Sequence, residues 1–122
     1  MGKSVIAAVD DLFFAAKIRA VAEHLGVNVR FVKSTDAALE AAHAELPALI
    51  IADLHSQKCD PFVLAGRLKM DERLRDVPLI GFFSHVQTAL QQRAEEAGFN
   101  RVMPRSLFTK RLQEILTGNW SG

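Results

Sequence analysis

The segment Ala48-Leu49-Ile50-Ile51-Ala52-Asp53 is the most informative part of the sequence. It is short, continuously apolar and ends on a carboxylate, which is typical of a strand buried on both faces of a parallel sheet. The segment Ser4-Val5-Ile6-Ala7-Ala8-Val9 has the same character and is followed by Asp10 and Asp11. Open α/β sheets bind ligands at the carboxyl ends of their strands. If these two strands are neighbours, we expect the three carboxylates to converge on one patch.

The remainder of the sequence alternates between strand-like and helix-like patterns. Short apolar runs predict five strands, at residues 5–9, 27–32, 48–52, 78–83 and 101–103. Apolar residues three and four apart predict five helices, at residues 12–25, 35–46, 61–68, 87–97 and 106–116. Strands that alternate with helices form parallel units with right-handed crossovers. We therefore expect an α/β protein, a three-layer doubly wound domain over residues 1–118, with a tail at 119–122.

The composition is that of an ordinary globular protein and narrows the function classes. The 122 residues are 49% hydrophobic and 24% charged, with a net charge of +1. Such a small net charge does not predict direct binding to nucleic acid or to a membrane. Cys59 is the only cysteine, which excludes an internal disulfide and suits a reducing compartment. The first apolar run is too short for a secretory signal or a membrane span, so we expect a cytoplasmic protein.

The three predicted carboxylates have two interpretations, and spacing alone leaves both open. Asp10, Asp11 and Asp53 would repel one another at close range, and a divalent cation such as Mg²⁺ would relieve that repulsion. An Asp beside a metal ion and a phosphoryl donor can act as a nucleophile and become an aspartyl phosphate. Alternatively, an Asp after a strand caps the next helix, which suits Asp11 well.

Four short motifs, in this order, resemble those of the receiver domain of two-component response regulators. They are Val9-Asp10-Asp11, Asp53-Leu54, Val77-Pro78-Leu79-Ile80 and Ala97-Gly98-Phe99. The resemblance covers nearly the whole chain and implies a flavodoxin-like receiver fold with strand order 2-1-3-4-5. It also implies Asp53 as phosphoacceptor, and a Mg²⁺ site formed by Asp10, Asp11, Asp53 and the backbone carbonyl of His55.

The resemblance further implies a signalling role and a set of partners. A sensor histidine kinase or a phosphotransfer protein would supply the phosphoryl group, and a downstream protein would read it. The face of the fourth strand, fourth helix and fifth helix would form a homodimer. The chain would not be an enzyme beyond self-phosphorylation and dephosphorylation at Asp53. Hydrolases that use an aspartyl phosphate place a second Asp two residues after the nucleophile, and His55 stands there instead.

Three positions, in two places along the chain, depart from the receiver pattern. The family has a Thr or Ser at the end of the fourth strand, and this position is Phe83, followed by Ser84. Ser84 would need a backbone adjustment to contact a phosphoryl group. The family has a Lys and then a cis-proline after the fifth strand, and these positions are Arg105 and Ser106. Arginine keeps the charge, but its planar fork has a different shape from an ammonium group.

Two functions therefore remain open from the sequence, and we favour the first. In the first, the chain is a stand-alone receiver in a phosphorelay, phosphorylated on Asp53 with Mg²⁺, and Arg105 contacts the phosphoryl oxygens. In the second, it is a degenerate receiver that binds partner proteins without phosphorylation. Adjacent Phe82 and Phe83 should point to opposite faces of the sheet, and both suit the core. If Phe83 instead covered Asp53, it would favour the second function.

Overall fold

The computed structural model describes residues 3–84 and 87–120 and contains one five-stranded parallel sheet. The strand order is β2-β1-β3-β4-β5, as predicted. The strands are β1 (Ser4–Ala8), β2 (Asn28–Phe31), β3 (Leu49–Asp53), β4 (Leu79–Phe83) and β5 (Arg101–Pro104). The order reverses between β1 and β3, and the carboxyl ends of these two strands therefore form the edge where ligands bind in such sheets.

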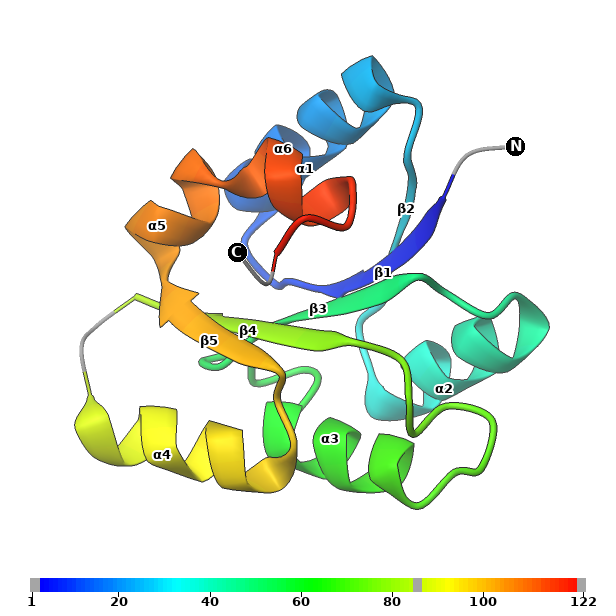
Figure 1. Cartoon of the computed structure of the whole chain (residues 1–122), viewed down its shortest axis with the longest axis vertical. Coiled ribbons are helices and arrows are strands. Elements are labelled where there is room, and N and C mark those ends of the chain that lie inside the picture. The colour runs from blue at the N-terminus through cyan, green and yellow to red at the C-terminus, as the bar shows by residue number, and fades with distance from the viewer. Residues whose placement is uncertain (1–2, 85–86, 121–122) are drawn as a thin grey trace.

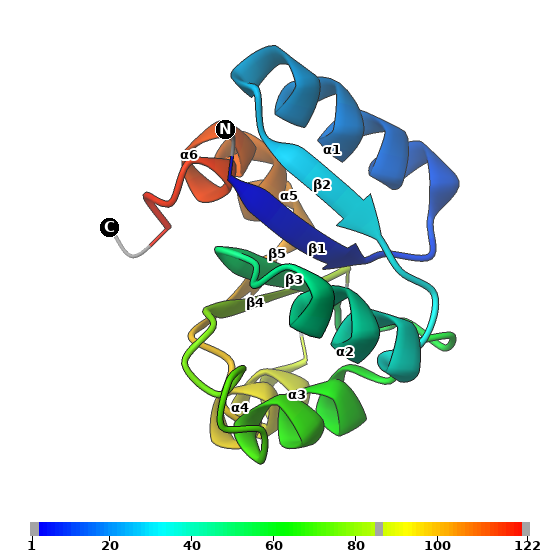
Figure 2. The ribbon, with the colours of Figure 1, turned by 90° about the vertical axis from the view of Figure 1, so that its right-hand side faces the viewer.

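Helices cover both faces of the sheet and complete three layers (Figures 1 and 2). One layer contains α1 (Leu12–Leu25), α5 (Arg105–Lys110) and α6 (Leu112–Leu116). The other contains α2 (Thr35–Ala44), α3 (Pro61–Lys69) and α4 (Thr88–Ala97). No helix among residues 3–84 and 87–120 is long and apolar enough to cross a membrane.

The sheet is buried on both faces, which explains its continuous apolar runs. All five residues of β3 are buried. Ile50 packs in the apolar cluster beneath α2, α3 and α4, and Ile51 packs in the cluster beneath α1, α5 and α6. Phe82 and Phe83 divide between the clusters in the same way, Phe83 with Ile50 and Phe82 with Ile51. The prediction that these adjacent aromatic residues point to opposite faces is confirmed.

Local capping residues set three helix ends where the sequence predicts them, whereas α2 ends at Ala44, two residues earlier than predicted. Gly26 ends α1 with φ +71°, a backbone conformation that favours glycine. The Ser34 hydroxyl accepts a backbone hydrogen bond at the start of α2. Asp60 caps α3 in the same way, and Pro61 is the first helical residue.

The predicted last helix, residues 106–116, is wrong in one respect, because the structure contains two helices there. Arg111 separates α5 from α6 with φ −101° and ψ 10°, outside the helical region. The Thr109 hydroxyl donates a hydrogen bond of 2.9 Å to the carbonyl of Arg105. Such a bond to the carbonyl four residues earlier competes with the helical pattern and bends helices.

The predicted tail is held against the domain as far as the structure describes it. The Asn119 N–H donates to the carbonyl of Glu114 at 2.8 Å, and Trp120 packs against the cluster beneath α1. The last two positions of the tail, 121 and 122, lie outside the described residues.

Helix α4 rests more lightly on the sheet than its neighbours. Ala94 is its only fully buried residue, whereas α3 buries four. Its capping residue, Gln87, makes no side-chain capping hydrogen bond.

Candidate functional site

The predicted acidic residues lie at one edge of the sheet. Asp10 and Asp11 follow β1, and Asp53 is the last residue of β3. The two strands are paired in register, with Ala8 opposite Ala52. Because the carboxyl ends of adjacent parallel strands share an edge, the sheet places both acidic segments side by side.

Asp53 is nearly enclosed, with 9% of its surface exposed. One carboxylate oxygen, Oδ1, accepts a hydrogen bond of 2.9 Å from the backbone N–H of His55. Burial raises the pKa of Asp53, and the negative charge of Asp10 adds to that increase. The His55 N–H and the positive charge of Arg105 act in the opposite direction. Both Asp10 and Arg105 are therefore close enough to affect the Asp53 carboxylate.

The loop between β3 and α3 donates hydrogen bonds to both carboxylate oxygens of Asp10. The Ser56 hydroxyl donates to Asp10 Oδ1 at 2.9 Å, and the backbone N–H groups of Gln57 and Lys58 donate to Oδ2 at 3.0 and 3.4 Å. Ser56 is itself buried, and its oxygen accepts a hydrogen bond from the Cys59 N–H at 3.1 Å. Sequence reasoning missed Ser56, since a single serine in a polar loop carries no recognisable signal.

Asp11 caps α1 and pairs with Arg105 at the same time. Its Oδ1 accepts the N–H groups of Phe13 and Phe14 at 2.9 and 3.1 Å. Its Oδ2 accepts a hydrogen bond of 2.9 Å from Arg105 Nη2. The Arg105 hydrogen bond is the main reason that the pKa of Asp11 is lowered, with help from the Phe14 N–H. The capping role that spacing left open for Asp11 is confirmed.

Arg105 is held in place from two sides. Its guanidinium carbon lies 4.0 Å from the centre of the Phe14 ring and 5.9 Å from that of Phe82. Phe14, Phe82 and Phe108 form an aromatic cluster beneath it, with ring centres 4.8 to 5.8 Å apart. A planar guanidinium suits an aromatic face and a carboxylate together, which an ammonium group does less well. The described arrangement therefore directs Arg105 to Asp11.

The two departures from the receiver pattern occupy different environments. Phe83 is 3% exposed and packs in the cluster beneath α2, α3 and α4. The residue of β4 in register with Asp53 is Phe82, on the opposite face. Phe83 is therefore a core residue and not a cover over Asp53. Ser84 and Ser106 are both exposed.

The acidic residues carry the ligand atoms of a magnesium site, but groups of the protein itself hydrogen-bond them. Their carboxylate oxygens are the ligands that Mg²⁺ prefers. Yet among residues 3–84 and 87–120 no three His, Cys, Asp or Glu side chains are grouped to hold a metal ion. The reason is visible in the contacts, because the loop engages both oxygens of Asp10 while Arg105 and α1 engage those of Asp11. The ligand roles predicted for Asp10, Asp11, Asp53 and the His55 carbonyl remain predictions.

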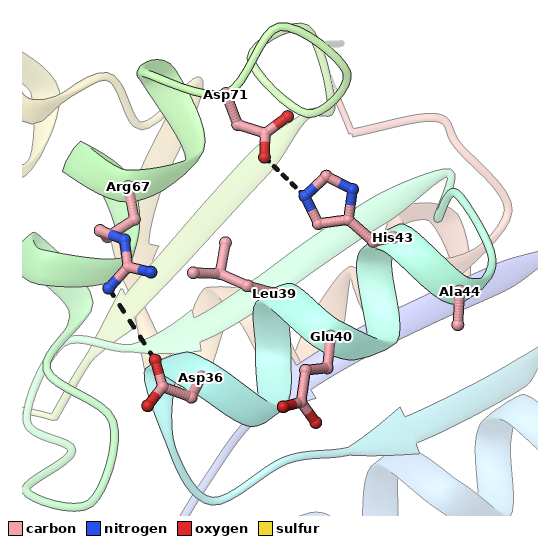
Figure 3. A pocket seen from close by; sticks show the side chains of 7 residues that line it. All are labelled: Asp36, Leu39, Glu40, His43, Ala44, Arg67 and Asp71. Carbon is pink, nitrogen blue, oxygen red and sulfur yellow. Dashed lines mark hydrogen bonds and ion pairs between the residues drawn. The ribbon is translucent and has the colours of Figure 1, made fainter.

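A larger hollow lies away from this site, between α2 and α3 (Figure 3). Its volume is about 730 Å³, and two ion pairs cross it. His43 Nε2 lies 2.6 Å from Asp71 Oδ2, and Arg67 Nη1 lies 3.9 Å from Asp36 Oδ1. Exposed pairs of this kind contribute little to stability. This groove lies between two helices, and none of the predicted site residues lines it.

Comparisons with known proteins agree on the fold. No protein-family model and no curated protein matches the sequence. Among solved structures, a response regulator from Hahella chejuensis matches with a TM-score of 0.86 and 20% identity, covering 98% of this chain and 96% of that one. A putative response regulator from Chloroflexus aurantiacus matches with a TM-score of 0.85 and 19% identity, covering 98% of both chains.

A third match connects the fold with a metal ion in a related protein. The receiver domain of a sensor histidine kinase from Pseudomonas aeruginosa has a TM-score of 0.83 and 21% identity, covering 96% of both chains. That structure is described with a magnesium ion coordinated in its active-site cleft. At these identities the likeness establishes the architecture and not the chemistry. The chain has the receiver fold of two-component response regulators.

Proposed function

We propose that the protein is a signalling module of the receiver fold that binds a partner protein without a phosphoryl group on Asp53. The observation that carries this proposal is the hydrogen-bonded ion pair between Arg105 and Asp11. In this proposal Arg105 supplies the positive charge that a metal ion would otherwise bring to the acidic pair. On the other side, donors from the loop before α3 hydrogen-bond both oxygens of Asp10.

The environment of Phe83 supports the same proposal. A receiver that responds to phosphorylation uses a hydroxyl at this position, according to the resemblance described above. Phe83 is buried in an apolar cluster and has no donor to offer. Without that hydroxyl, a phosphoryl group on Asp53 would lose its connection to β4. The surface that binds the partner protein would then have the same conformation at all times. The signal would depend on whether the partner is available and not on phosphorylation.

One observation favours a second function, phosphorylation of Asp53 by a histidine kinase or phosphotransfer protein in a phosphorelay. Asp10 and Asp53 stand at the ends of two strands that pair in register, which places both carboxylates at one edge of the sheet, as expected of an acidic site that a cation could neutralise. In this case Arg105 would leave Asp11 and contact the phosphoryl oxygens. Ser84, exposed and next to Phe83, would be a weaker candidate for such a contact. Transfer depends mainly on positioning and charge neutralisation, so a missing hydroxyl need not abolish it.

Intact-mass spectrometry separates the two functions. The protein is incubated with acetyl phosphate and Mg²⁺, beside Asp53→Asn and Arg105→Ala variants. Our proposal expects no phosphate adduct on the wild-type protein and no effect of Mg²⁺ on its mass or its binding of a partner. An adduct on the wild-type protein that Asp53→Asn removes would instead establish phosphorylation. An adduct on Arg105→Ala alone would support the view that Arg105 blocks the acidic pair.

A further inference from the structure

A cavity of about 380 Å³ opens between α1, the end of β2 and the loop before α3. Its volume falls in the range of small-molecule sites. It lies at the carboxyl ends of β1 and β2, the edge at which α/β sheets bind ligands. Asp10 is the one acidic site residue that lines it, whereas Asp11, Asp53 and Arg105 do not. The cavity is therefore beside the acidic site and largely distinct from it.

Three cations line this cavity: Arg19 from α1, Lys33 from the segment after β2, and Lys58 from the loop before α3. In the part of the chain that the structure describes, no carboxylate lies within ion-pair distance of any of them. Arg19 is nevertheless positioned, because its guanidinium carbon lies 4.8 Å from the centre of the Phe31 ring. Three separate elements thus bring unpaired positive charge to one cavity.

The carboxylate oxygens of Asp10 already accept hydrogen bonds from within the protein. Its two oxygens accept three hydrogen bonds from the loop, including the backbone N–H of Lys58 at 3.4 Å. Asp10 sets one negative charge against the three positive charges that line the cavity, which leaves a net positive charge there. A doubly charged anion is the ligand that three converging cations favour.

The remaining wall of the cavity is apolar. Leu12 lines it with 76% of its surface exposed and so offers an apolar face to the cavity. A ligand with an apolar portion would cover Leu12 while its anionic group met the cations.

We propose that this cavity binds a small organic phosphate, with the phosphate among Arg19, Lys33 and Lys58 and the organic portion against Leu12. Arginine and lysine together provide a planar fork and two point charges, a combination suited to a tetrahedral dianion. The backbone N–H of Lys58 also donates to Asp10. A ligand that contacts the Lys58 side chain would therefore add a second contact that holds the loop before α3 in place.

Backbone amide NMR on the ¹⁵N-labelled protein tests this proposal. The probes are adenosine monophosphate and phenyl phosphate, with adenosine and inorganic phosphate as partial ligands. We expect saturable shifts of the amides of Leu12, Lys33 and Lys58 with both organic phosphates, and weaker binding of each partial ligand. The variant Lys33→Ala/Lys58→Ala should bind at least about tenfold more weakly, as expected for the loss of two charge-assisted contacts.

Two controls make the outcome decisive. Lys110→Ala removes an exposed cation that does not line the cavity, and it should bind as the wild-type protein does. Arg105→Ala removes the cation of the acidic site and should also leave binding unchanged. Shifts centred on Asp53 and Arg105, equal affinity of the double variant, or no saturable binding of either organic phosphate would each overturn the proposal. Equal affinity for inorganic phosphate would overturn the assigned contact with Leu12.

Discussion

Replacing Phe83 by threonine restores the hydroxyl that the resemblance places at the end of β4, yet we expect it to destabilise the protein. Phe83 is 3% exposed and lies in an apolar cluster with Leu54, Ala94 and Phe99. Truncating a buried phenylalanine to alanine typically costs about 3–5 kcal/mol, because apolar contact is lost and a cavity remains. Threonine returns one methyl group but adds a hydroxyl among apolar neighbours, and an unsatisfied hydroxyl costs roughly 1–3 kcal/mol.

The methyl group that threonine keeps and the hydroxyl that it adds roughly offset each other, so the net loss in the free energy of unfolding stays near the value for alanine, about 4 kcal/mol. This is a large part of the roughly 5–15 kcal/mol that stabilises a typical domain. With a urea slope of about 1–3 kcal/mol per molar, the midpoint of unfolding should fall by around 2 M. Urea titration followed by circular dichroism measures both the midpoint and the slope.

Two matched variants isolate the cause. Phe83→Leu keeps most of the apolar volume and should lose less than about 1.5 kcal/mol. Ser84→Thr places the same hydroxyl and methyl at the exposed neighbouring position and should change stability by no more than about 0.5 kcal/mol. The reasoning is refuted if Phe83→Thr loses under about 1 kcal/mol, or if Phe83→Leu loses as much as Phe83→Thr does.

Three further predictions concern the acidic site. Burial raises the pKa of Asp53, so the charged carboxylate is less stable in the folded protein than in the unfolded chain. Asp53→Asn removes this charge and should therefore raise the urea midpoint at neutral pH. The gain should shrink as the pH falls below the carboxyl range, where the wild-type Asp53 is protonated. A constant gain across that pH range would contradict this. Arg105→Ala frees Asp11 Oδ2 and should tighten Mg²⁺ binding in an NMR titration, whereas weaker or unchanged binding would count against the role of Arg105 as a substitute cation. Ser56→Ala removes a buried hydroxyl that donates to Asp10 and should cost about 1.5–3 kcal/mol by urea titration, with Ser106→Ala as an exposed control.

The sheet and most helices could be predicted because their signals are local. The strand after Ala48 is a single apolar run, and the structure places it at Leu49–Asp53, one residue later than predicted. Helix α1 has the predicted bounds, since an acidic cap and a glycine stop mark its two ends. The last helix was harder, because the hydroxyl of Thr109 interrupts a pattern of apolar spacing that continues past Arg111.

The contacts of the acidic site could not be predicted, since they join residues far apart in the chain. Ser56 meets Asp10 across 46 positions, and Arg105 meets Asp11 across 94. Spacing identifies which acidic residues share an edge but not which donors reach them. The Arg105 guanidinium stacks on the Phe14 ring and hydrogen-bonds Asp11 at the same time, and only the folded chain brings these two partners together.

The light attachment of α4 has a consequence for how the domain moves. Ala94 is its only fully buried residue, and Gln87 makes no side-chain capping hydrogen bond, so we expect this helix to detach from the sheet at less cost than its neighbours. Its amides should exchange with deuterated solvent earlier than those of α1 or α3, while the central strands stay protected. A partner protein that changes the conformation of this domain on binding would displace α4 at a lower free-energy cost than the other helices. Substitutions in α4 would likewise disturb the core less than substitutions in those helices.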